Sequence, residues 1–392
     1  MKLSIPTQGP SGSQAGPRLS LCMIVKNEAK TLEKCLSLAR PHVDEIVVVD
    51  TGSTDGTQDI ARRYADVYDE IEWPGSFAVA RNHSLDLATS EYILILDGDE
   101  YIEKPDAWKR IRESLGLLDY AAMLLPVKNL LGDTNVVEAD VFWQERILRN
   151  HPDIRYFGSV HNQVMEAIAA HAKQTGRQVV RLDAEIVHTG YALPEAEMVK
   201  KYKTRLDLLR QEYENPRSDI YRAYYGYQLG LIYFIMRRNE EAAQLFASID
   251  YAKLTPENAY YTRLLGAQTE MRLNRYADAL VHCNEMLALN PREPVGFYLT
   301  GVALMRAEQI EDGMLMLLQS YHVNEQTDGY VRFVFNTRIL LRHLTVACRS
   351  IGLEQHARAF ESIGMAETFD PEEVKSYILA LQSAFARASV PA

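Results

Sequence analysis

The chain has 392 residues, of which 47% are hydrophobic and 24% are charged, a composition typical of a folded protein long enough for two domains. Its 53 acidic residues outnumber 42 basic ones, and the net charge of −11 argues against nucleic acid or an anionic membrane as the main partner. The four cysteines, at positions 22, 35, 283 and 348, are too few for a disulfide framework and favour a reducing compartment.

Residues 1–18 are rich in Gly, Ser, Gln and Pro and lack the apolar stretch of a secretory signal, so we expect a disordered leader there. No apolar run in the chain reaches the roughly eighteen residues of a transmembrane helix, so we expect no membrane span. Together with the cysteine content, these features favour a cytoplasmic protein.

Strand and helix patterns alternate in the first half of the chain. We expect strands that begin at Leu19 and that cover 45–50, 67–73 and 92–97, and helices that contain Leu32–Ala39 and cover 57–64 and 77–88. This alternation predicts a mostly parallel sheet, in which ligands bind beyond the carboxyl ends of the strands. The residues at those ends are Asn27, Asp50, Trp73 and Asp97. Two carboxylates should therefore meet in one crevice.

Helical patterns dominate after about Pro194. Three segments resemble one another, at 221–249, 263–291 and 297–324. Their aligned small residues, Ala242, Ala279 and Gly313, are 37 and 34 residues apart, and the second offset equals the tetratricopeptide period. We expect Val331–Met365 to continue as helix and to cap the repeats. The alternative is an ordinary α-helical domain with a Leu, Ala and Tyr core.

Two carboxylates, Asp97 and Asp99, flank Gly98 directly after an apolar strand. Hard oxygen ligands on a tight turn can hold a divalent ion, which neutralises a diphosphate as it leaves. The same pattern also occurs in solvated acidic turns, so its context decides its meaning. We expect the Asp99 carboxylate to be exposed at the strand end.

Four segments, in this order and spacing, resemble the family 2 glycosyltransferases of GT-A fold: Leu21–Glu28, Val47–Thr57, Ala80–Asn82 and Leu94–Glu100. The helical second half resembles the subgroup that includes glycosyltransferases of glycopeptide bacteriocins and flagellins. The resemblance implies an α/β, Rossmann-like GT-A nucleotide-sugar domain over 19–192, a helical linker over 193–220 and an all-α, tetratricopeptide-like repeat domain over 221–392.

The resemblance also implies a donor site and a metal site. The implied donor-binding residues are Ile24, Glu28, Asp50, Arg81, Asp97 and Gly98. Asp50 would accept a hydrogen bond from the nucleotide base, and Asp99 would hold Mg²⁺ or Mn²⁺. Arg81 would lie near the base and the diphosphate, where its positive charge would be useful. The alternative is a helix surface charge paired with Asp86 or Glu91.

The residues expected to face the acceptor come from the segments 142–150 and 154–162, which resemble a second block of the family. Glu145 stands where such enzymes carry a catalytic acidic motif, although Gln-Glu-Arg replaces the usual Glu-Asp pair. As the general base Glu145 would deprotonate the acceptor; the alternative is an ion pair with Arg146 or Arg149. His188 resembles a carboxy-terminal metal ligand, with a structural histidine as the alternative.

These features together imply a metal-dependent, inverting glycosyltransferase that moves a sugar from a UDP-sugar to a peptide or protein side chain. One alternative is a glycosyltransferase that acts on a surface polysaccharide or another glycan. Another is a non-catalytic repeat adaptor, against which the retained Asp50, Arg81, Asp97 and Asp99 count. The helical repeats could also form a homodimer.

Overall fold

The computed structural model describes residues 17–117, 119–131, 137–190, 195–325, 333–366, 368 and 370–388. Residues 1–16 of the expected leader lie outside this range, whereas the Arg18 backbone N–H donates to Glu91 at 2.9 Å. The chain divides into two compact units. The first comprises 1–126, 143–157 and 162–186, and the second comprises 127–142, 158–161 and 187–392. The domain boundaries expected at residues 192 and 220 stay a prediction.

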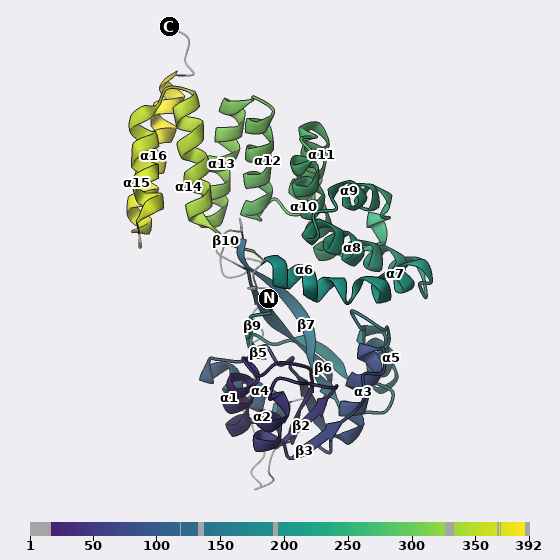
Figure 1. The fold of residues 1–392 in the computed structure, drawn as a ribbon. Helices are drawn as coiled ribbons and strands as arrows, with labels where there is room; N and C mark the ends of the chain where they lie inside the picture. Colours follow the sequence, from purple (N-terminus) through teal and green to yellow (C-terminus); the bar gives the residue numbers. More distant parts are fainter. Residues whose placement is uncertain are drawn as a thin grey trace. The chain divides into compact units, whose positions relative to one another are not determined.

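The predicted alternation of strands and helices is confirmed (Figure 1). The elements are β1 (Leu19–Val25), α1 (Leu32–Ala39), β2 (Glu45–Asp50), α2 (Thr57–Tyr64), β3 (Val67–Glu70), α3 (Phe77–Leu87) and β4 (Tyr92–Ile95). The expected strand end at Trp73 is wrong, because β3 ends at Glu70. Trp73 instead packs edge-on against Phe77, with ring centroids 4.8 Å apart, beside the turn at Pro74 and Gly75.

The order in which strands are added to the sheet changes direction at β1. Later strands are β5 (Glu100–Tyr101), β6 (Tyr120–Leu130), β7 (Val137–Arg149), β8 (Gln178–Arg181) and β9 (Ile186–His188). The strand order is β3-β2-β1-β4-β7-β6-β9-β5, and β8 pairs with β6. The strands β3, β2, β1 and β4 are parallel, and β7 is antiparallel to β4. Because the chain turns to opposite sides of β1 to form β2 and β4, the carboxyl ends of β1 and β4 make a topological switch point, where ligands of such sheets bind.

Helices cover both faces of the sheet in the first unit. Figure 1 shows α1, α2 and α4 (Pro105–Leu117) on one side and α3 and α5 (Met165–Thr175) on the other. On the α3 and α5 side, Ile93, Ile95 and Leu148 of the sheet pack with Leu85 and Ile168 of the helices. These apolar layers leave only the strand ends for polar chemistry.

The second unit is mainly helical. Its helices are α6 (Glu195–Lys203), α7 (Leu206–Glu214), α8 (Asp219–Ile235), α9 (Asn239–Ser248), α10 (Pro256–Arg272), α11 (Tyr276–Leu289), α12 (Pro294–Arg306), α13 (Ile310–Glu325), α14 (Thr337–Ser350), α15 (Glu354–Met365) and α16 (Pro371–Ala388). From α8 to α15 they form successive helix pairs (Figure 1). The repeat begins earlier than expected in its second and third copies, at Pro256 and Pro294, because proline opens each first helix.

Small residues let the two helices of each pair approach closely. A Cβ at Gly230 would lie 2.3 Å from Phe246, and one at Gly266 would lie 2.6 Å from His282. A Cβ at Gly301 would lie 2.7 Å from the Gly313 carbonyl oxygen. These glycines recur at close to the 34-residue period of tetratricopeptide repeats, which confirms the predicted repeat architecture.

The expectation of unbroken helix over 331–365 is wrong. Residues Phe333–Phe335 form a strand, β10, that pairs antiparallel with β7, with Phe333 opposite Asp140. Aromatic and β-branched residues favour such pairing. The Phe333 ring also stacks on Tyr261, with centroids 6.0 Å apart and planes 8° apart, so packing reinforces the strand.

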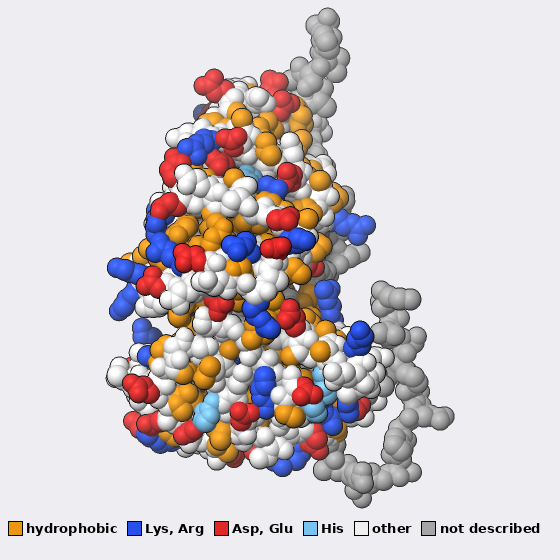
Figure 2. Space-filling model, turned by 90° about the vertical axis from the view of Figure 1, so that its right-hand side faces the viewer, with side chains coloured by type: hydrophobic (Ala, Val, Ile, Leu, Met, Phe, Trp, Pro, Cys, Tyr) orange, Lys and Arg blue, Asp and Glu red, His pale blue; other side chains and the backbone are white. Residues whose placement is uncertain are grey.

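The surface agrees with the mixed charge of the sequence. Figure 2 shows one face, on which basic and acidic side chains are interspersed rather than gathered into a patch of one sign. Within the described part of the chain, no helix combines the length and apolar character that crossing a bilayer requires.

Candidate functional site at the carboxyl ends of β1, β2 and β4

Hydrogen bonds join the loops that follow β1 and β2. Asn27, in the left-handed region at φ 57°, donates its backbone N–H to Ser53 Oγ at 2.9 Å. Its side-chain Oδ1 accepts the Thr54 backbone N–H at 2.8 Å. The Glu28 backbone N–H donates to Thr57 Oγ1 at 2.8 Å. The predicted donor residues Glu28 and Asp50 are therefore held on one rigid double loop, with half-buried Ile24 near the end of β1.

Asp50 combines a fixed orientation with an unsatisfied oxygen. The residue is 1% exposed, and its Oδ1 accepts the backbone N–H groups of Gly52 and Ser53, both at 2.8 Å. Its Oδ2 is buried and has no hydrogen-bond partner among the described residues. A buried acceptor without a donor costs about 1–3 kcal/mol, so this oxygen is suited to a donor from a ligand.

Arg81 pairs with Asp97 at the end of β4. Its Nη2 lies 2.7 Å from Asp97 Oδ1, and the guanidinium lies over the Tyr156 ring at 5.5 Å. The alternative partners are engaged elsewhere: Asp86 pairs with Arg155, and Glu91 accepts the Arg18 backbone N–H. Burial acts to lower the pKa of Arg81, but Asp97 and its neighbours raise it overall. Arg81 therefore stays charged and holds Asp97.

Glu100 and Arg146 support the turn that carries Asp97 and Asp99. The buried Glu100 carboxylate accepts the Asp97 backbone N–H at 2.9 Å and two Arg146 bonds at 2.8 and 2.6 Å. Sequence reasoning assigned no role to this ion pair. Gly98 lies against Glu28, since a Cβ at Gly98 would be 2.8 Å from Glu28 Cγ. The glycine thus permits the two predicted donor loops to meet.

The expectation of an exposed Asp99 is wrong, because the residue is only 9% exposed. The turn folds back through the Asp97 carbonyl, which accepts the Glu100 backbone N–H at 3.0 Å. Burial raises the pKa of nearby Cys35, and the carboxylates of Glu100, Asp99 and Asp97 raise it further. This negative potential and the oxygen donors of Asp97 and Asp99 fit a hard divalent cation such as Mg²⁺ or Mn²⁺.

Glu145 lies on β7 beside Arg146 and is half-buried. Its alternative role in an ion pair is not seen, since Arg146 pairs with Glu100 and Arg149 pairs with Asp119. Burial raises the pKa of Glu145, while its own backbone N–H and Arg146 lower it in part. A carboxylate with a raised pKa is better matched to general-base chemistry than an exposed one.

Tyr156 is a site residue that sequence reasoning missed. Burial raises its pKa to about 12; Arg81 and Arg146 lower it, and Glu145 and Asp97 raise it. The Tyr156 hydroxyl therefore lies within electrostatic range of charged residues on both α3 and β7. Asn82 fixes the Tyr156 backbone with two hydrogen bonds, of 2.9 and 2.8 Å. The available signal was that Asn82 and Tyr156 lie in two segments that resemble the same family.

His188 belongs to the second unit, whereas Asp97 and Asp99 belong to the first. Asn129 donates its Nδ2–H to Asp140 Oδ1 at 2.6 Å, so its oxygen faces His188 Nδ1 at 2.7 Å. An amide oxygen only accepts, so His188 Nδ1 carries a proton in this contact. The role of His188 as a metal ligand stays a prediction.

Comparison with known proteins shows what the first unit resembles. Residues 20–123 match the sequence profile described as Glycosyl transferase family 2. A TPR repeat-containing protein of Synechococcus elongatus is 34% identical over 157 residues, 40% of this chain and 38% of the relative. The SPbeta prophage-derived glycosyltransferase SunS of Bacillus subtilis is 29% identical over 249 residues, 62% of this chain and 54% of the relative. The chain thus spans about half the length, or less, of these curated relatives.

A solved structure was also matched. Glucosyl-3-phosphoglycerate synthase from Mycobacterium tuberculosis, in complex with Mn²⁺, uridine diphosphate and phosphoglyceric acid, is 16% identical with a TM-score of 0.37. The match covers 50% of this chain and 78% of that one. Residues 20–123 are thus similar to family 2 glycosyltransferases, and the helix pairs of the second unit are arranged as tetratricopeptide-like repeats.

Proposed function

We propose that this protein is a metal-dependent, inverting glycosyltransferase that moves a sugar from a UDP-sugar to a peptide or protein side chain. The observation that carries the proposal is Asp50 Oδ2, a buried acceptor without a described partner at the carboxyl end of β2. Uracil has one ring N–H donor, which an orphaned carboxylate oxygen can accept. The acidic turn after β4 lies at the switch point beside it, where a diphosphate would follow the base.

Asp97 and Asp99 would hold Mg²⁺ or Mn²⁺. The bound ion would neutralise the charge that develops on the leaving diphosphate. Arg81 holds the Asp97 carboxylate, and Glu100 holds the Asp97 backbone, so the turn is preorganised before a donor arrives.

Glu145 would act as the general base. In a one-step inverting displacement, a carboxylate on the side opposite the leaving diphosphate takes the proton of the acceptor as its oxygen, sulfur or nitrogen attacks the sugar. Burial raises the pKa of Glu145, which brings its proton affinity nearer to that of the acceptor. The neighbouring Arg146 is occupied by Glu100 and therefore does not neutralise Glu145 by direct pairing.

The second unit would bind the acceptor. It contains an open pocket of about 400 Å³ between α7, α8 and α9, whose lining includes Arg210, Tyr213, Leu229, Tyr233 and Glu241. Aromatic, apolar and charged groups together suit a peptide segment with mixed side chains. Helical repeats commonly bind extended partners, which supports a macromolecular acceptor.

The test begins with donor hydrolysis, because slow hydrolysis reveals the donor without knowledge of the acceptor. Mass spectrometry of a panel of nucleotide sugars incubated with the chain and Mn²⁺ should show loss of one UDP-sugar. Asp99→Asn should abolish the metal dependence of UDP binding in calorimetry. If the wild-type chain neither binds UDP nor hydrolyses any donor, the proposed function is refuted.

The second step isolates the base, with the donor taken from the hydrolysis assay and the acceptor found by peptide screening. Glu145→Gln should leave UDP affinity unchanged and lower transfer by about 10²-fold or more. The matched control is Glu138→Gln, an exposed glutamate on the same strand, which should transfer normally. Equal loss of donor binding and transfer in Glu145→Gln would assign Glu145 to the donor side instead.

A further inference from the structure

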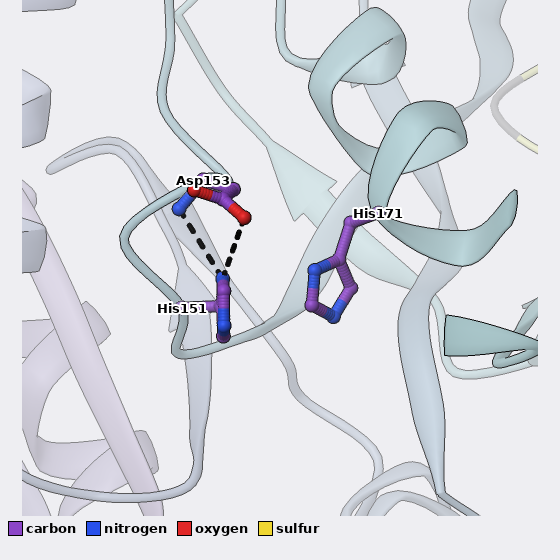
Figure 3. A group of neighbouring side chains, drawn as sticks. All are labelled: His151, Asp153 and His171. Atoms are coloured by element: carbon purple, nitrogen blue, oxygen red, sulfur yellow. Dashed lines mark hydrogen bonds and ion pairs between the residues drawn. The ribbon is translucent and has the colours of Figure 1, made fainter. Parts of the chain in front are cut away.

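A second group of ligand-type side chains lies in the first unit, away from the acidic turn. His151 and Asp153 follow β7, and His171 lies on α5. One ligand atom from each residue lies within 4.8 Å of the others (Figure 3). The figure shows the His171 ring beside His151 and Asp153, so groups from two separate segments converge.

His171 is the unusual member of this group. The residue is 2% exposed, and neither Nδ1 nor Nε2 has a hydrogen-bond partner among the described residues. A neutral imidazole has one donor and one acceptor nitrogen, and burying both unsatisfied is costly. The structure therefore retains a buried ligand atom without a protein partner.

His151 and Asp153 complete the donor set. His151 Nδ1 lies 3.5 Å from Asp153 Oδ2 and accepts the Asp153 backbone N–H at 3.3 Å. The two imidazole rings are 4.4 Å apart between centroids. Asp153 is 63% exposed, which leaves a path for an ion from solvent. The nearby Arg149 and Arg177 both pair with Asp119, which offsets one of their two positive charges.

This group lies at the opposite end of β4 from the proposed catalytic turn. Arg149 is paired with Tyr92 at the start of β4, and His151 comes just beyond it. Asp97 follows the other end of β4, about 16 Å away at the usual strand rise. One ion therefore cannot serve both groups.

We propose that His151, Asp153 and His171 form a zinc-class metal site that ties α5 to the loop after β7. Zinc bonds of about 2.0–2.1 Å in a tetrahedron place ligand atoms about 3.3 Å apart, which the 3.5 Å between His151 Nδ1 and Asp153 Oδ2 already approaches. A bound ion would replace the Asp153 backbone hydrogen bond at His151 Nδ1. The other separations, at most 4.8 Å, would have to shorten by up to about 1.5 Å when the ion binds. Two imidazoles and one carboxylate favour Zn²⁺ over the hard ions suited to Asp97 and Asp99, and water would take the fourth position.

The test measures Zn²⁺ binding to the full chain, prepared without a histidine tag and without nucleotide. Competition with a chromophoric chelator should give one tight Zn²⁺ per chain. Asp153→Asn and His151→Ala, both at accessible positions, should weaken that binding at least tenfold. The control is His83→Gln, a half-exposed histidine that pairs only with Asp69 in the described contacts and should bind Zn²⁺ as the wild type does.

A structural readout makes the test independent of catalysis. Zn²⁺ should raise the unfolding temperature of the first unit in the wild type and in Asp99→Asn, and it should not do so in Asp153→Asn. Absence of a tight Zn²⁺ in the wild type overturns the proposal. So does Zn²⁺ binding that survives Asp153→Asn and His151→Ala, or that is lost in Asp99→Asn, since the ion would then bind elsewhere.

Discussion

The Glu100–Arg146 ion pair offers a direct test of how the acidic turn is held. Glu100→Gln keeps the size of the side chain and removes its charge. The Glu100 carboxylate accepts two hydrogen bonds from Arg146 and one from the Asp97 backbone N–H. Glutamine has one acceptor oxygen, and its amide N–H groups would face N–H groups of Arg146 or Asp97. Arg146 would be left as a buried cation without its counter-ion.

The expected cost follows from burial. Removing one partner of a buried ion pair destabilises a protein by about 3–5 kcal/mol, because the remaining charge is uncompensated. For a unit of this size each kcal/mol lowers the unfolding temperature by about 2–4 °C, so Glu100→Gln should lower it by about 6–20 °C. The Arg146→Met and Glu100→Gln double variant should lose less than the two single variants together, because it retains no buried charge.

Tryptophan fluorescence during thermal unfolding is the suitable assay. The three tryptophans, Trp73, Trp108 and Trp143, all belong to the first unit, so their signal reports that unit alone. The control is Glu103→Gln, whose 62% exposed side chain pairs with exposed Lys34 at 3.6 Å and should change stability by less than about 0.5 kcal/mol. If Glu100→Gln unfolds within the range of this control, the ion pair does not support the turn.

The raised pKa of Glu145 predicts that the transfer rate depends on pH. The rate should fall as the pH decreases through that pKa, and this fall should occur above pH 4.5, the pKa of an ordinary glutamate. Because burial disfavours the ionised form in the folded state, the stability of the first unit should decrease as the pH rises through the same range. Initial transfer rates and unfolding temperatures, measured across pH, test the two expected directions. Gly301→Ala should destabilise the second unit by about 1–3 kcal/mol in circular dichroism melts, because the new Cβ meets the Gly313 carbonyl and α12 and α13 must separate. Gly116→Ala on α4, with nothing within 4 Å of the new Cβ, should instead stabilise its helix by up to about 1 kcal/mol, and a loss there would contradict the packing argument.

Local patterns predicted much of the first unit. The apolar runs at Leu19, Glu45 and Tyr92 are strands because each is buried on both faces, and their polar ends bring Asp50 and Asp97 to one edge. Such information is contained in short stretches of sequence. The period of the small residues likewise predicted the helix pairs, since each repeat packs mainly on its neighbours.

Long-range contacts were beyond these patterns. Glu100 and Arg146 are 46 residues apart, and nothing near either residue identifies its partner. The short β10 strand was missed because Phe333–Phe335 becomes extended only by pairing with residues near Asp140. The burial of Asp99 likewise depends on how the turn folds back through Glu100, which its acidic composition does not reveal.

The interleaving of the two units along the chain has a consequence for folding during synthesis. The first unit has all its segments once residue 186 has left the ribosome, but residues 127–142 belong to the second unit. Val137 lies opposite Phe335 in the β7–β10 pairing, so this pairing can form only after nearly two hundred further residues have been translated. We expect the nascent chain to carry an unpaired strand edge at residues 137–140 through this interval. Such an edge can pair with another chain or attract a chaperone, and any truncation between 187 and 332 would leave it unpaired.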